Sequence, residues 1–163
     1  MTEVAHDPLY SLAHLTLINA TTPELIYIAD RAGYDAVSPR FIPMNVPGEF
    51  KQSPIDNQMI AATKIALKTT GIKVLDIELA RITEDCDPRN FERALELGGE
   101  LGAKRMIMSA WTTDRTDRNF ILDCFSETCE IAYQYGLSVD LEFPSFSRLR
   151  TLDEALDIVR AAK

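Results

Sequence analysis

One unit occurs four times in this sequence: an amphipathic helical segment, a glycine at its end, and a short apolar stretch that finishes on a polar or charged residue. The glycines of the four copies are Gly33, Gly71, Gly102 and Gly136. Glycine adopts the left-handed conformation just past a helix without a Cβ clash, so each copy predicts a change from helix to strand. The sequence therefore predicts an α/β fold of repeated βα units, in which the strands form a parallel sheet.

The predicted strands are apolar on one side only. The apolar positions are Ala13, Leu15 and Leu17; Leu75, Ile77 and Leu79; Met106, Met108 and Ala110; and Val139, Leu141 and Phe143. The alternate positions are His14 and Thr16; Ser38 and Arg40; Asp76 and Glu78; Arg105 and Ser109; and Ser138, Asp140 and Glu142. Strands of an open doubly wound sheet are apolar on both faces, because helices cover both. The pattern instead favours a barrel whose polar interior opens at the carboxyl ends of the strands.

The length limits how much of a barrel the chain can form. Five strands are predicted at about 10–18, 35–41, 73–82, 104–110 and 137–143, and five helices at about 22–33, 55–70, 89–102, 117–135 and 151–163. A complete eightfold βα barrel needs roughly 250 residues. We expect residues 1–163 to form a single domain, an incomplete TIM-barrel-type fold with about five of the eight units. Exposed sheet edges attract partners, so further polypeptide or a second copy is expected to complete it.

Composition excludes several classes of partner. The formal net charge of −8 argues against nucleic acid and anionic membranes, because both attract basic surfaces. No apolar stretch is long enough to span a membrane, and the first ten residues do not resemble a signal peptide. Three cysteines (Cys86, Cys124 and Cys129) show no metal-ligand spacing, which favours a reducing cytoplasm.

Glu142 is the leading candidate for chemistry. It ends the predicted strand Leu137–Phe143, and a carboxylate at a barrel mouth can bind a hard divalent cation or take a proton from a carbon beside a carbonyl. The alternative is a structural carboxylate held by Arg40, Arg81 or Arg105.

Four segments carry a resemblance to a known family: Ser11–Leu17, Pro23–Val37, Gly71–Glu78 and Gly136–Phe143. Together they resemble the sugar phosphate isomerase/epimerase family of xylose isomerase-like TIM barrels, which is related to ketose 3-epimerases and endonuclease IV. In its epimerases, the glutamate that ends strand five is a metal ligand and one of two acid/base residues. The resemblance gives both roles to Glu142. It implies a divalent metal such as Mn²⁺ or Mg²⁺, whose other ligands (an aspartate, a histidine and a second glutamate) lie on strands six to eight, outside this chain.

Three charged residues near strand ends are candidates for substrate binding. By the same resemblance, Glu78 lines the pocket and contacts a hydroxyl group. Arg40 can bind a phosphate or carboxylate through two hydrogen bonds. Arg81 lies three residues after Glu78. For these residues the alternative is an ion pair of Glu78 with Arg81 or Arg40.

Three further residues are expected at the substrate pocket. His14 is predicted near the middle of the first strand, where a buried structural histidine is the alternative. Trp111 follows strand four beside Ser109 and can form an aromatic wall for a sugar ring, or simply pack at the rim. The loop 42–54 between the second strand and second helix is either a lid or an ordinary surface loop.

The residues and the resemblance together predict a divalent-metal-dependent isomerase or epimerase of a small sugar, sugar phosphate or related polyhydroxy carbonyl compound. Its proton transfer passes through an enediol or enediolate. Activity is expected in the complete barrel and not in this chain alone. The alternatives are a lyase or dehydratase on the same barrel, and a non-catalytic structural or regulatory subunit.

Overall fold

The computed structural model describes residues 8–51, 53 and 56–162. Six parallel strands form two sheets in the order β1-β2-β3 and β4-β5-β6. Their bounds are β1 Ser11–Ala13, β2 Ala36–Ser38, β3 Lys73–Val74, β4 Ile77–Ile82, β5 Arg105–Ala110 and β6 Ser138–Glu142. A bridge between Arg40 and Glu78 joins the two sheets, so the strands follow one another in chain order.

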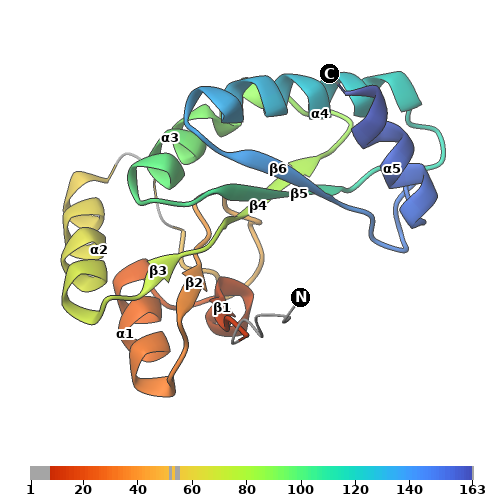
Figure 1. The fold of residues 1–163 in the computed structure, drawn as a ribbon. Coiled ribbons are helices and arrows are strands. Elements are labelled where there is room, and N and C mark those ends of the chain that lie inside the picture. The colour runs from red at the N-terminus through yellow and green to blue at the C-terminus, as the bar shows by residue number, and fades with distance from the viewer. Residues whose placement is uncertain (1–7, 52, 54–55, 163) are drawn as a thin grey trace, which may run out of the picture.

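Five α-helices and two 3₁₀ helices connect the strands. They are η1 His14–Leu17, α1 Thr22–Ala32, α2 Asn57–Thr70, η2 Pro88–Phe91, α3 Glu92–Glu100, α4 Arg118–Gln134 and α5 Leu152–Ala161. Helices α1 to α4 lie along one side of the curved strands, and α5 lies against α4 (Figure 1). The opposite face, called the lumen face below, has no helix packed along it among the described residues. No described helix is long and apolar enough to cross a membrane.

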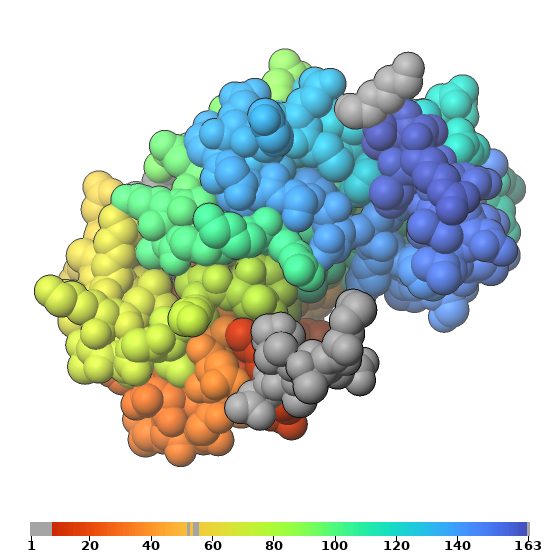
Figure 2. Space-filling model, in the orientation of Figure 1, coloured from red at the N-terminus to blue at the C-terminus, as the bar shows by residue number. Residues whose placement is uncertain are grey.

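The arrangement is an open arc rather than a closed barrel. Among the described strands, β1 pairs with β2 alone and β6 with β5 alone. Figure 2 shows the amino-terminal residues in red and orange and the carboxy-terminal residues in blue on opposite parts of the surface, with green residues between them. The predicted class, a parallel and incomplete TIM-barrel-type fold, is confirmed.

Apolar side chains between the sheet and the helices form the core. Met106 and Met108 of β5 and Ile77 and Ile82 of β4 are fully buried there. Leu95 of α3 belongs to the same cluster. Burying apolar surface in this way is the main stabilising contribution, and it fixes the alternate residues of β4 to β6 on the lumen face.

Local signals place the helices as the sequence predicts. Thr151 and Glu154 form the predicted capping box at the start of α5, and Thr21 and Glu24 form a second one at the start of α1. Each box satisfies backbone N–H groups that a helix leaves without an internal partner. Lys163, the predicted end of the last helix, lies outside the described residues.

Gly136 lies between α4 and β6, with a φ of +77°. An added Cβ would have no neighbour within 4 Å, so any cost of a larger residue there comes from the backbone alone. We expect Gly136→Val to lower the free energy of unfolding by about 1–2 kcal/mol, the penalty of the left-handed conformation for a β-branched residue. Gly136→Asn is the matched control, because asparagine tolerates this conformation better. Equal urea midpoints for Gly136→Val and the wild type would contradict the expectation.

Two predicted strands need correction. The first ends at Ala13, and His14 begins the 3₁₀ helix η1, so His14 is not a strand residue. As a result Leu15, predicted on the buried side, is 60% exposed. The third predicted strand is divided into β3 and β4, and its register shifts between Ile77 and Ala80. This irregularity puts Ala80 in the core in place of Leu79.

Candidate functional site

Three predicted site residues form a row at the carboxyl ends of neighbouring strands. Arg81 of β4 is in register with Ser109 of β5, and Ser109 is in register with Glu142 of β6. Residues in register on parallel strands lie side by side on one face, here the lumen face. Ser109 is fully buried, whereas Glu142 is exposed. The carboxylate of Glu142 makes no hydrogen bond or ion pair with a described residue, so the structural pairing with arginine does not form.

Trp111 lies next to this row and is held from three sides. Its indole Nε1 donates a hydrogen bond of 3.1 Å to Ser109 Oγ. The Arg81 guanidinium lies 5.0 Å from the centre of the indole ring. The ring of Phe146 meets it edge-on, with the ring centres 5.4 Å apart. Arg81 therefore stacks on an aromatic ring, a cation–π contact, instead of pairing with Glu78.

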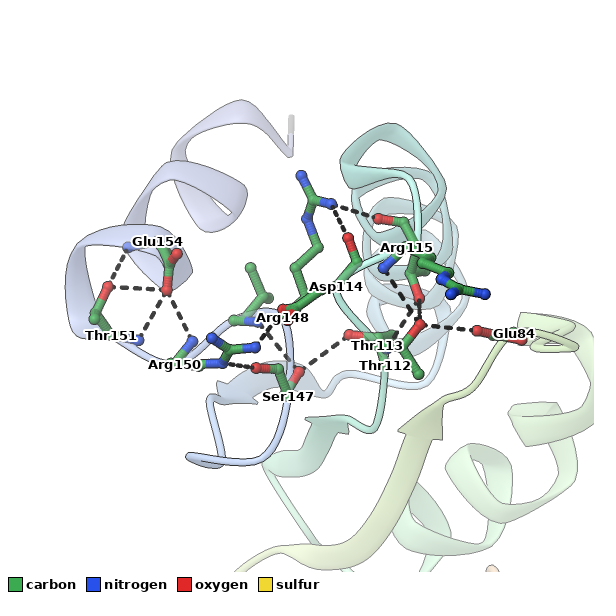
Figure 3. Close-up of polar contacts among 12 residues, drawn as sticks. Glu84, Thr112, Thr113, Asp114, Arg115, Ser147, Arg148, Arg150, Thr151 and Glu154 are labelled. Carbon is green, nitrogen blue, oxygen red and sulfur yellow. Dashed lines mark hydrogen bonds and ion pairs between the residues drawn. The ribbon is translucent and has the colours of Figure 1, made fainter.

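The loops that follow β5 and β6 are joined by polar contacts (Figure 3). The hydroxyl groups of Thr112 and Ser147 lie 3.0 Å apart. Arg148 Nη1 donates to the backbone oxygen of Thr116 at 2.8 Å, and Arg150 pairs with Asp114. Because these loops start directly after the strands that carry Ser109 and Glu142, the contacts stabilise the rim on which both residues sit.

A buried ion-pair cluster lies where the two sheets meet. Arg40 Nη2 donates to Glu78 Oε2 at 3.1 Å, as one alternative from the sequence had it. Glu49 of the loop after β2 places its Oε1 3.7 Å from Arg40 Nη1. Both Arg40 and Glu78 are largely buried, with 6% and 8% exposure. Arg40 thus lies between two carboxylates away from solvent.

The two carboxylates beside Arg40 differ in how readily they ionise. Burial raises the pKa of Glu78 to about 7, although the charge of Arg40 acts in the opposite direction. For Glu49, burial also disfavours the charge, but hydrogen bonds from three backbone N–H groups outweigh it and hold the pKa below its usual range. Glu49 is therefore the permanent counter-ion of Arg40, and Glu78 is the one that titrates.

His14 is buried, and backbone groups occupy both ring nitrogens. Its Nδ1 accepts from the N–H of Arg40 at 2.9 Å, and its Nε2 lies 2.9 Å from the carbonyl oxygen of Ala20. These partners require the neutral tautomer with the proton on Nε2. Burial lowers the pKa of His14, which favours the same neutral form. His14 thus fixes the backbone at Arg40, and its predicted contact with substrate remains a prediction.

Sequence reasoning missed two residues of this region, Glu49 and Phe146. Glu49 is in a loop rich in proline and glycine, where no periodic pattern assigns a side chain to a face. Phe146 follows β6 in a similar irregular stretch. The Pro-Gly pair before Glu49 was the one available signal, because it indicates a turn that can bring the next side chain back toward the strand.

The described residues do not by themselves fit a bound metal ion. No group of three or more His, Cys, Asp or Glu side chains among residues 8–51, 53 and 56–162 is arranged to hold one. Ions such as Mg²⁺ need about six ligands, most of them oxygen atoms, and Glu142 supplies one carboxylate.

Comparison with known proteins supports the fold. No protein-family model matches the sequence, and no curated protein matches it either. Among solved structures, a xylose isomerase-like TIM barrel protein from Mycobacterium smegmatis in complex with magnesium has a TM-score of 0.72 and 14% identity, over 99% of this chain and 63% of that one. The IOLI protein with a zinc atom has a TM-score of 0.70 and 21% identity, over 93% of this chain and 58% of that one. A sugar phosphate isomerase/epimerase from Parabacteroides distasonis has a TM-score of 0.53 and 13% identity, over 86% of this chain and 53% of that one.

These structures define the class of fold as the xylose isomerase-like TIM barrel. This confirms the fold that the four sequence segments suggest. The chain spans about three fifths of the Mycobacterium smegmatis and IOLI structures and about half of the Parabacteroides distasonis one. Two of these structures hold a divalent metal, zinc in one and magnesium in the other.

Proposed function

We propose that this chain contributes part of the active site of an isomerase or epimerase that acts on a small sugar, sugar phosphate or related polyhydroxy carbonyl compound. The observation that carries the proposal is the row of Arg81, Ser109 and Glu142 across three strands, with its exposed carboxylate at the mouth. Active sites of TIM barrels lie at this end of the strands. Supporting this, one solved structure of similar fold is described as a sugar phosphate isomerase/epimerase.

Glu142 is the proposed acid/base residue. Its carboxylate takes the proton from the carbon next to the substrate carbonyl, and the electrons of that C–H bond form an enediolate. A second acid/base group outside this chain, on the opposite face of the same carbon, gives a proton to that face and forms an epimer, whereas return of the proton from Glu142 to the former carbonyl carbon gives an isomer. The indole of Trp111, fixed by Ser109 and Arg81, forms the wall against which the sugar carbons pack.

A divalent metal such as Mn²⁺ or Mg²⁺ belongs to this proposal with Glu142 as the one ligand from this chain. The other ligands come from outside the described residues, because these offer no suitable cluster. The zinc and magnesium held by two structures of similar fold support this assignment.

We further propose that residues 1–163 are one partial barrel domain completed by further polypeptide or by a second copy. The unpaired outer edges of β1 and β6 support this, because strand edges readily pair with other strands. Three free thiols, at Cys86, Cys124 and Cys129, favour a cytoplasmic location.

The test is proton exchange on a panel of ketoses and ketose phosphates. The completed barrel, meaning this chain together with the further polypeptide or second copy that completes it, is incubated with each compound in D₂O in the presence of Mn²⁺ or Mg²⁺. Proton NMR follows loss of the signal of the hydrogen on the carbon beside the carbonyl. Exchange together with a new epimer or isomer is the expected result. Exchange accompanied by loss of water would indicate the dehydratase alternative. Absence of both exchange and turnover across the panel, from a folded and metal-loaded protein, would contradict the proposal.

A further inference from the structure

The guanidinium of Arg40 is buried, and most of its hydrogen-bonding capacity is unused. The residue is 6% exposed, yet among the described residues neither Nε nor Nη1 has a hydrogen-bond partner. Its one side-chain hydrogen bond is the one from Nη2 to Glu78. A buried donor without an acceptor lowers the stability of the fold. The unpaired N–H groups of Arg40 therefore indicate a position at which a hydrogen-bond acceptor can bind.

Glu49 shows what kind of group this position receives. Its carboxylate lies 3.7 Å from Arg40 Nη1, which is near enough for charge attraction and too far for a hydrogen bond. The same oxygen, Oε1, accepts from the backbone N–H of Met44 at 2.8 Å, and Oε2 accepts from the N–H groups of Asn45 at 2.7 Å and Val46 at 3.4 Å. Successive N–H groups that converge in this way form an anion-binding concavity.

The carboxylate therefore sits between a guanidinium and three N–H groups, and its side chain is 2% exposed. Guanidinium and backbone N–H groups are also the donors that bind phosphate oxygens. Glu49 occupies the position from a short loop that has two residues with positive φ, Asn45 at +60° and Gly48 at +81°. Among the described residues, the Glu49 carboxylate accepts hydrogen bonds only from its own loop.

We propose that Arg40 and the backbone N–H groups of residues 44–46 form a binding site for a small oxyanion, a phosphate or carboxylate group, which Glu49 fills in the absence of ligand. Withdrawal of Glu49 leaves room for the bound group to accept hydrogen bonds from Nε and Nη1, the two guanidinium nitrogens that have no partner among the described residues. The loop 44–49 then acts as an internal competitor that the ligand has to displace. The proposal does not depend on the isomerase proposal, since it concerns binding alone.

The test is removal of the internal carboxylate by Glu49→Ala. Inorganic phosphate and sodium acetate are titrated into the variant and into the wild-type chain, with calorimetry and thermal melting as readouts. We expect phosphate to bind the variant about 10- to 100-fold more tightly than the wild type, the range that one charge-assisted hydrogen bond provides. Fructose 6-phosphate and fructose are titrated in parallel. A sugar phosphate that binds more tightly than phosphate identifies a substrate group as the ligand, whereas equal affinity identifies the free anion.

Two controls separate this site from general charge effects. Glu100→Ala removes an exposed carboxylate that pairs with Lys64, and it should bind phosphate as the wild type does. Adding Arg40→Met to Glu49→Ala should abolish the gained affinity. If Glu49→Ala does not fold, the same titrations are made with Glu49→Gln, which removes the charge and keeps the volume of the side chain. This variant should also bind phosphate more tightly than the wild type. Phosphate affinity unchanged from the wild type in the folded variant, or a gain that survives Arg40→Met, overturns the proposal.

Discussion

Glu142→Gln is expected to lower turnover of the completed barrel by about 10²-fold or more, the usual contribution of a general acid/base group. Glutamine has nearly the same size as glutamate, but its amide cannot act as a base that takes up a proton from the substrate. Folding should change little, because Glu142 is exposed and has no hydrogen bond to a described residue. Turnover is measured together with the urea midpoint, so that lost chemistry and lost structure are separated.

Asp140→Asn is the matched control for this variant. Asp140 lies on the same strand and the same face, two residues from the mouth, and is also exposed. Its partner is Arg105 at 3.9 Å, and its predicted effect on turnover is less than tenfold. If the two variants lost activity equally, a general effect of charge in the lumen would explain the result. Full activity of Glu142→Gln would remove Glu142 from the mechanism.

The sequence predicts the fold well because its strongest signals are local. A glycine after each helix and one apolar side per strand need no knowledge of distant contacts, and they identify both the βα order and the polar lumen face. What local patterns cannot show is a change of register within a strand. The shift between Ile77 and Ala80 lies in β4, which follows β3 of the first sheet and pairs with β5 in the second, so it depends on a neighbour almost 30 residues away along the chain.

The candidate site is predictable where it lies on regular strands. Ser109 and Glu142 occupy the expected face because both strands keep their alternation. Pairing among charged residues was open, since the sequence allowed Glu78 to bind Arg40 or Arg81. Packing determines the pairing. Arg81 stacks on the ring of Trp111, and the β-bridge between Arg40 and Glu78 brings those two residues together. Glu49 approaches Arg40 through the shape of an irregular loop, for which no sequence periodicity exists.

A pH-dependent stability is expected from Glu78. Burial raises its pKa in the folded chain to about 7, whereas the ordinary value is 4.5. Between these pH values the folded chain keeps a proton that the unfolded chain has released. The contribution of Glu78 to stability is therefore fully present below about pH 4.5 and is lost as the pH rises to about 7 and beyond. The full loss amounts to about 3 kcal/mol.

Other buried groups also make the stability depend on pH, and their contributions have to be distinguished from that of Glu78. Burial lowers the pKa of His14, so its contribution has the opposite sign: stability increases as the pH rises toward the ordinary histidine value. Burial raises the pKa of Asp76, which adds to the effect of Glu78 at lower pH. The informative quantity is thus the difference between the wild type and Glu78→Gln, in which the contribution of His14 largely cancels. Asp76 interacts with Glu78, so its part of the difference belongs to the pair of carboxyl groups.

The measurement is urea unfolding of both proteins at pH 5, 6, 7 and 8. We expect the advantage of the wild type over Glu78→Gln to shrink by about 1–3 kcal/mol between pH 5 and pH 8, because only the wild type has this carboxyl group to titrate. Glu100→Gln serves as the control for the loss of one exposed carboxylate. Parallel curves for the wild type and Glu78→Gln would mean that Glu78 is charged throughout. Arg40 would then have two permanent counter-ions rather than one, and the ion pair would be tight enough to outweigh burial.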